Sequence, residues 1–116
     1  MANTKTSKPR QEHILIDSAP VSAGAWTNPV NPGEKKVPNL YFSIRETGDG
    51  SDAFTATVTM QWRQKNGDTW EEWQVYDTYT VVTRKIVEDH SAEVQYRAGV
   101  DDGDYTSGEL TVGFNW

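Results

Sequence analysis

The chain has 116 residues, a formal net charge of −6 and no cysteine. That length supports one compact core and hardly two, and five Trp, five Tyr and three Phe supply large rings to fill it. The absence of cysteine excludes disulfide bonds, thiolate metal sites and a cysteine nucleophile. The acidic balance argues against nucleic acid as a partner, because binding phosphates requires clustered Lys and Arg. We therefore expect one domain that is stabilised by packing alone.

Residues 1–12, MANTKTSKPRQE, differ from the remainder of the chain. They carry three basic side chains but show neither apolar periodicity nor the apolar segment of a secretory signal peptide. No stretch approaches the ~20 apolar residues of a membrane helix. We expect a flexible arm over residues 1–12, a β-sandwich domain over residues 13–116, and a complete, soluble product made in the cytosol. The candidate contact residues of the arm are Lys5, Lys8, Pro9 and Arg10.

After the arm, apolar and polar side chains alternate with a period of two, which predicts a mostly β protein. In the clearest strand, residues 53–63, the inward side chains are those of Phe54, Ala56, Val58, Met60 and Trp62. Similar alternation predicts strands over residues 40–45, 93–100 and 110–116, with shorter candidates at 13–18, 25–27 and 79–87. Turn signals separate them at residues 28–29, 31–33, 48–50, 66–67, 102–103 and 107–108. The pattern favours a single antiparallel β-sandwich of about seven or eight strands, Ig-like or jelly-roll-like.

The segment VTMQWRQKNGDTWEEWQVY, residues 58–76, predicts a hairpin with three tryptophans. If Asn66 and Gly67 form a two-residue loop, Lys65 lies opposite Asp68. That register places Trp73 opposite Met60 and Val75 opposite Val58 on the buried side. It places Trp70 opposite Arg63 on the solvent side, where the two can form a cation–π pair. A slip by one residue is rejected, because it would bury the Glu72 carboxylate. Trp62 and Trp73 are therefore expected in the core, and Trp70 outside it.

Few residues suggest catalysis or a cofactor. His13 and His90 are far apart in the sequence and fit neither a zinc site nor a catalytic triad. The neighbouring carboxylates of 71–72 and 88–89 point to opposite faces of a strand, which argues against an acid/base pair. The side chains of Asp49, Asp52, Asp101, Asp102 and Asp104 leave Ca²⁺ binding open, although no EF-hand spacing is present. We expect no enzyme activity, no cofactor and no metal.

The segment AFTATVTMQWRQKNGDTWEEW, followed by VQYRAGVDDGDYTSGELTVGFNW, resembles small β-sandwich virion proteins of tailed bacteriophages. The resemblance covers roughly residues 40–116 and carries no catalytic motif. It implies a non-enzymatic structural protein: a capsid decoration or cement protein, a head-fibre base, or a neck or tail accessory protein. The implied partners are the major capsid protein or another virion protein and sister subunits, with a trimer favoured, and neither nucleic acid nor membrane. The implied location is the virion, after synthesis in the host cytoplasm.

A different class of function stays open. Trp70, Tyr76 and Tyr105 are candidate exposed aromatic contacts, and such rings can stack on sugars. The alternative hypothesis is therefore a carbohydrate-binding or receptor-recognition module, as in a tail fibre or adhesin.

Overall fold

The computed structural model describes residues 11–21, 23–32, 39–46, 54–88 and 93–116. These residues form antiparallel β-strands. The strands are β1 (Gln11–Ile16), β2 (Ala25–Trp26), β3 (Leu40–Glu46), β4 (Thr55–Ala56), β5 (Val58–Asn66), β6 (Thr69–Trp70), β7 (Gln74–Tyr79), β8 (Thr83–Val87), β9 (Val94–Val100), β10 (Tyr105–Ser107) and β11 (Leu110–Asn115). None of the described residues belongs to a helix that is long and apolar enough to cross a membrane.

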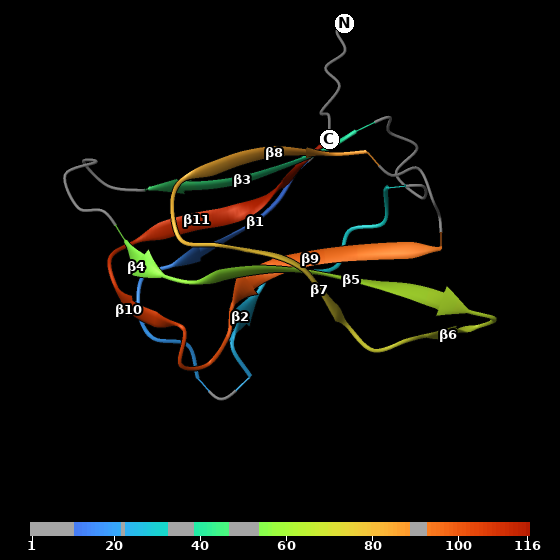
Figure 1. The fold of residues 1–116 in the computed structure, drawn as a ribbon, viewed down its shortest axis with the longest axis horizontal. Coiled ribbons are helices and arrows are strands. Elements are labelled where there is room, and N and C mark those ends of the chain that lie inside the picture. The colour runs from blue at the N-terminus through green and yellow to red at the C-terminus, as the bar shows by residue number, and fades with distance from the viewer. Residues whose placement is uncertain (1–10, 22, 33–38, 47–53, 89–92) are drawn as a thin grey trace, which may run out of the picture.

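Two sheets face each other in a sandwich (Figure 1). The first sheet has the strand order β1-β11-β3-β8. The second has the order β2-β9-β5, and both β6 and β7 pair with the far side of β5. A small pair, β10 and β4, lies at one end. The expected all-β, antiparallel sandwich-like fold is confirmed.

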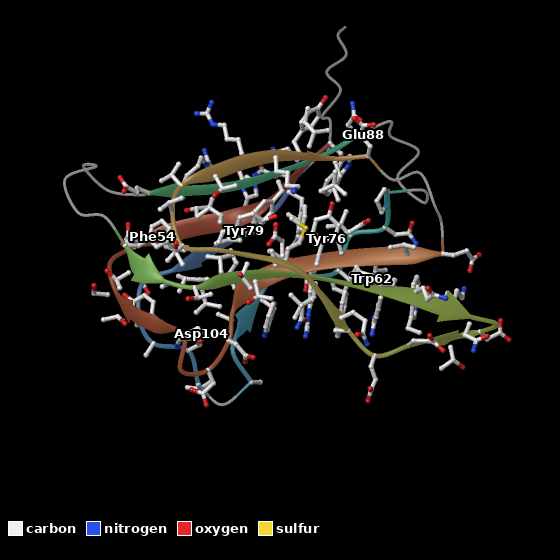
Figure 2. All side chains as sticks on the ribbon, in the orientation of Figure 1. Phe54, Trp62, Tyr76, Tyr79, Glu88 and Asp104 are labelled. Carbon is white, nitrogen blue, oxygen red and sulfur yellow. The ribbon has the colours of Figure 1, made fainter. Side chains whose placement is uncertain are left out.

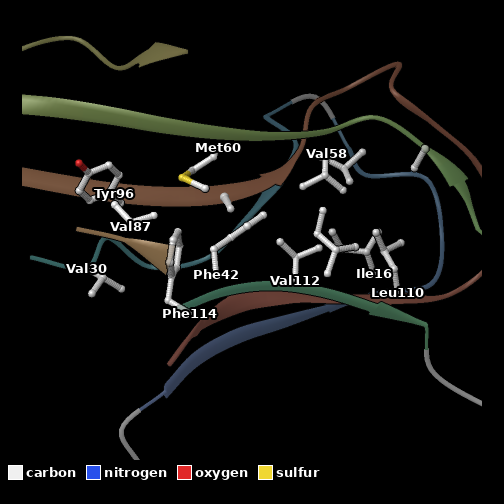
Figure 3. Packing of buried hydrophobic residues seen from close by; sticks show 14 of the residues in the cluster. Ile16, Val30, Phe42, Val58, Met60, Val87, Tyr96, Leu110, Val112 and Phe114 are labelled. Carbon is white, nitrogen blue, oxygen red and sulfur yellow. The ribbon is translucent and has the colours of Figure 1, made fainter. Parts of the chain in front are cut away.

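The core lies between the two sheets (Figure 3). Phe42 on β3 is 1 % exposed, and its ring centre lies 5.2 Å from that of Tyr79 and 5.5 Å from that of Phe114. The alternation predicted for three strands is confirmed, because every second residue of β3, β9 and β11 is directed into this core. The fully buried members are Leu40, Ile44, Val58, Met60, Ala98, Val100, Leu110, Val112 and Phe114.

Three predicted strands have different bounds in the structure. The predicted strand over residues 53–63 is two strands, because β4 pairs with β10 while β5 pairs with β9. Between them, the Thr57 N–H donates to the Asp104 carbonyl, at 2.8 Å. The segment 79–87 is also divided, since Tyr79 ends β7 in the second sheet and β8 begins in the first. β1 starts at Gln11, two residues earlier than expected, since Gln11 and Glu12 lie opposite Asn115 and Phe114.

The predicted register of the hairpin is wrong. Asn66 lies opposite Thr69, so the two-residue loop is Gly67-Asp68 rather than Asn66-Gly67. The backbone of Gly67 has a φ of 66°. Hairpin turns of this length need a positive φ at the first central position, which glycine adopts without a Cβ clash. Glycine therefore takes the first position of the loop, and the whole register moves by two residues.

The register shifts again beyond the turn. Lys65 lies opposite Trp70, whereas Trp62 lies opposite Gln74, so the chain between β6 and β7 holds one additional residue that β5 does not match. Such a bulge reverses which face the side chains occupy on its two sides. Val75, predicted to be buried, is 61 % exposed, and Trp73 lies on the outer face. Trp62 is partly buried and packs against the core, as expected.

Candidate functional site

The outer face of the second sheet carries a row of alternating rings and cations, which we call the cation–π ladder. Its members, in order, are Trp26, Arg97, Trp73, Arg63, Trp70 and Lys65. The guanidinium carbon of Arg97 lies 4.3 Å from the ring centre of Trp26 and 4.5 Å from that of Trp73. The guanidinium carbon of Arg63 lies 4.4 Å from Trp73 and 5.3 Å from Trp70. The expected pair of Arg63 and Trp70 is confirmed, but it is one step of a longer stack.

Two glutamines hold the cations of the ladder in place. Arg63 is opposite Gln95 and Arg97 is opposite Gln61 in the pairing of β5 with β9. The Nε of Arg63 donates to the Gln95 amide oxygen at 2.8 Å, and the Nε of Arg97 donates to the Gln61 amide oxygen at 2.7 Å. Burial lowers the pKa of Arg97, and the nearby charge of Arg63 lowers it further. A guanidinium stays protonated at any physiological pH, so the ladder keeps its positive charge.

The ladder corrects the expectation for Trp73. The ring lies between two guanidiniums on the outer face instead of in the core. The physical reason is the register shift between β6 and β7, which moves Trp73 to the face opposite Trp62. Because cations lie over its ring, Trp73 does not offer an open surface for sugar stacking.

The structure does not bring the three candidate aromatic contacts together. Trp70 is half-buried in the ladder on β6, while Tyr105 lies on β10 at the opposite end of the sandwich (Figure 1). Tyr105 packs against the core, and its hydroxyl donates to the Gly108 carbonyl, so it is not the exposed contact that was expected. Tyr76 is 41 % exposed, and its ring packs edge-to-face with that of Tyr96, with 5.8 Å between the ring centres. The sequence-based set of contacts is therefore not one platform.

An open groove of about 900 Å³ lies beside the β5–β6 hairpin. Its lining includes the indole of Trp62 and polar side chains on the same face of the hairpin, namely Gln64, Asn66, Thr69, Glu71 and Gln74. The Asn66 amide nitrogen donates to a Glu71 carboxylate oxygen at 3.3 Å. An indole surrounded by amide and carboxylate groups offers one apolar surface and several hydrogen-bonding groups.

One side of the sandwich exposes apolar side chains beside two open strands. We call this surface the β7–β8 edge and define it by Val75, Tyr76, Asp77, Val81, Val82, Arg84, Lys85 and Ile86. Among the described residues, eight large hydrophobic side chains are exposed, and five of them belong to this edge. Tyr41, beside Ile86 in the register of β3 with β8, adds a sixth. β7 and β8 are the last strands of their sheets on this side.

Side chains from both sheets fill the space between the two edge strands. Figure 2 shows Tyr76 and Tyr79 there. The Lys85 Nζ of β8 lies 5.5 Å from the ring centre of Tyr76 on β7. Burial first, and then the charge of Asp77, raise the pKa of Tyr79 to about 12. Tyr79 is therefore neutral at physiological pH, and Asp77, Arg84 and Lys85 supply the charges of the β7–β8 edge.

The remaining candidate residues do not converge in the described part of the chain. The His13 ring Nε2 lies 2.8 Å from the Asn115 side-chain oxygen. The Asp101 carboxylate accepts the Asp102 N–H within a turn, at 2.8 Å. Among the described residues, no three His, Asp or Glu side chains gather as a metal site requires. Several candidates lie outside the described residues, namely Lys5, Lys8, Pro9, Arg10, Asp49, Asp52, Asp89 and His90.

Comparisons of the chain with protein-family models, curated proteins and solved structures found no match.

Proposed function

We propose that this chain is a non-enzymatic structural protein of a tailed-bacteriophage virion, a capsid decoration, cement or head accessory protein that binds the shell and sister subunits. The observation that carries the proposal is the β7–β8 edge, where exposed apolar side chains are concentrated. Isolated apolar residues are normal on a soluble protein, whereas apolar residues gathered together mark an interaction surface. An open strand edge also invites pairing with another chain.

Other features support the same proposal. The resemblance of residues 40–116 to phage β-sandwich virion proteins points to adhesion as the function. The basic residues of 1–12 contrast with the acidic chain as a whole, and such segments contact partners through charge. A protein that acts by adhesion needs a rigid body, which the two packed sheets provide.

The proposal is tested by the composition of the particle. Virions of the phage that encodes the chain are purified, their proteins are identified by mass spectrometry, and the particle is reconstructed by electron microscopy. We expect density for the sandwich on the head, neck or tail in symmetric copies. Particles that contain none of this chain would overturn the proposal.

Removal of residues 2–10 tests the role of the arm. The deletion stops before Gln11, where β1 begins, so we expect an unchanged circular dichroism spectrum and melting temperature. We expect attachment to purified shells to weaken about tenfold, because each lost contact between a basic side chain and an acidic shell contributes roughly 0.2–1 kcal/mol. Co-sedimentation with purified shells measures the attachment. The matched control is Lys5→Gln/Lys8→Gln/Arg10→Gln, which keeps the length of the arm. Equal attachment of all three proteins would exclude the arm from the mechanism.

A second candidate function is carbohydrate recognition, and the groove beside the β5–β6 hairpin favours it. The combination of Trp62 with amides and a carboxylate suits a neutral oligosaccharide, because sugars present apolar faces and hydroxyl groups. Binding to an array of neutral glycans is measured for the wild type, for Gln74→Ala and for the control Gln11→Ala, because Gln11 is an exposed residue of β1, outside the groove. We expect the signal to fall only in Gln74→Ala. Absence of wild-type binding would exclude this function.

A further inference from the structure

The β7–β8 edge presents two open strands on the same side of the sandwich. β7 belongs to the second sheet and β8 to the first, and residues 80–82 connect them (Figure 1). The chain reverses direction in this connection, so the two edge strands run antiparallel to each other. A partner that docks here meets both sheets at once. It must therefore offer two strand edges, or one broad apolar surface.

We infer that the partner on this edge is a second copy of the chain, related by a two-fold axis that runs parallel to the strands. In this arrangement β7 of each copy lies against β8 of the other. The inference deepens the proposed function by identifying which surface joins sister subunits, and it rests on that proposal only for its biological setting. Each sheet of one copy then continues into the opposite sheet of the other.

The strand directions permit the arrangement. Rotation about an axis parallel to the strands exchanges the two sheet layers but keeps the direction of every strand. β7 of the second copy then lies in the same layer as β8 of the first copy, next to it, and runs antiparallel to it. Antiparallel neighbours are the more stable pairing for edge strands. The contact uses both edges of both copies at once, so it closes as a dimer. For this surface we expect a dimer, whereas the resemblance implied a trimer.

A second two-fold arrangement is possible, and the charged side chains of β7 and β8 favour the first arrangement, which we call the crossed arrangement. An axis perpendicular to the sheets would pair β8 with β8 and β7 with β7. In the aligned register of the five-residue strand β8, Lys85 would then lie opposite Lys85 of the other copy. Like charges directly opposite each other across two strands are destabilising. The crossed arrangement instead brings Asp77, the charged residue of β7, toward Lys85 of the other copy, because Asp77 lies opposite the buried Met60 and Lys85 opposite the buried Phe42, on the inner faces of their strands.

The exposed apolar residues supply the remaining complementarity. Val75 is 61 % exposed on β7, Val81 is 66 % exposed in the connection and Ile86 is 53 % exposed on β8. Val75 lies opposite Gln61 on the outer face of the second sheet, and Ile86 lies opposite Tyr41 on the outer face of the first. Because the second sheet of one copy continues into the first sheet of the other, Val75 of each copy lies beside Ile86 of the other. Burial of apolar surface at about 25 cal/mol per Å² is the main favourable contribution to such an association.

The native mass of the full chain tests the inference. We expect light scattering and sedimentation to show a species of twice 13.1 kDa that dissociates on dilution. Val81→Asp should abolish it. The matched control is Val21→Asp, because Val21 is 80 % exposed but lies outside the edge, and this variant should stay dimeric. Both substitutions are at exposed positions, so both proteins should keep the wild-type circular dichroism spectrum.

Charge reversal tests the orientation. In the crossed arrangement, Asp77→Lys and Lys85→Glu should each raise the dissociation constant about tenfold, because both contacts of the dimer become repulsive. The double variant Asp77→Lys/Lys85→Glu should restore the dimer. If like edges pair instead, each single variant replaces one like-charge pair by another and leaves the dissociation constant nearly unchanged.

The outcomes separate this inference from the proposed function. A monomer at all concentrations, a trimer, or a dimer that tolerates Val81→Asp would overturn the inference, as would unchanged dimers of the two charge-reversal variants. The composition of the particle is a separate measurement. A dimer that is absent from virions would overturn the proposed function alone, and a monomer that is present on virions would overturn the inference alone.

Discussion

Replacement of Phe42 by alanine should lower the free energy of unfolding by about 3–5 kcal/mol, the range typical of a large aromatic side chain in a core. Phe42 is 1 % exposed, and its ring touches both sheets through Phe114 on β11 and Tyr79 on β7. Alanine leaves a cavity that the rigid sheets close only partly. Because small domains are stable by about 5–15 kcal/mol, this loss is a large fraction of the total. Urea unfolding followed by tryptophan fluorescence measures it.

The matched control for this substitution is Tyr41→Ala, on the neighbouring position of the same strand. Tyr41 is 46 % exposed on the outer face of β3, so its removal leaves no buried cavity. We expect a loss of about 1 kcal/mol or less. Equal losses for the two substitutions would contradict the assignment of Phe42 to the interior, and with it the register of β3 in the first sheet.

Replacement of Trp73 by alanine should lower the free energy of unfolding by about 1–3 kcal/mol. The ring lies between the guanidiniums of Arg63 and Arg97, and each cation–π contact contributes roughly 0.5–1 kcal/mol at an exposed site and more where it is desolvated. The lost contact area of the indole adds to this. Removal of the ring also leaves two like charges without the aromatic group between them. Chemical unfolding of the purified variant measures the loss.

A double-mutant cycle separates the ladder from the core position that the sequence predicted for Trp73. Arg97→Gln is combined with Trp73→Ala, and the coupling between them is the difference from additivity. The ladder predicts a coupling of at least about 0.5 kcal/mol. A core tryptophan would instead show a loss near 3–5 kcal/mol and no coupling to an arginine on the outer face.

The positions of the ladder residues could not be read from the sequence. Trp26 and Arg97 are separated by most of the chain, and only the pairing of β2 with β9 brings them together. Trp73 reaches the ladder because the chain between β6 and β7 departs from regular pairing. Irregularities of this kind depend on the packing of both neighbouring sheets, so a local pattern does not predict them. The sequence did indicate one contact, between Arg63 and Trp70, because these residues are close in the hairpin.

The sequence by itself determined which residues alternate into the core on β3, β9 and β11, since the two-residue period of a strand is local and covalent. It also determined that the hairpin turns at Gly67, because only glycine adopts a positive φ without strain. The tertiary structure alone decided the register beyond that turn, the outward position of Trp73 and the meeting of β7 and β8 on one open side. These features depend on contacts between segments that are distant in sequence. The free energies of those contacts depend on how the two sheets pack, and a local sequence pattern does not contain that information.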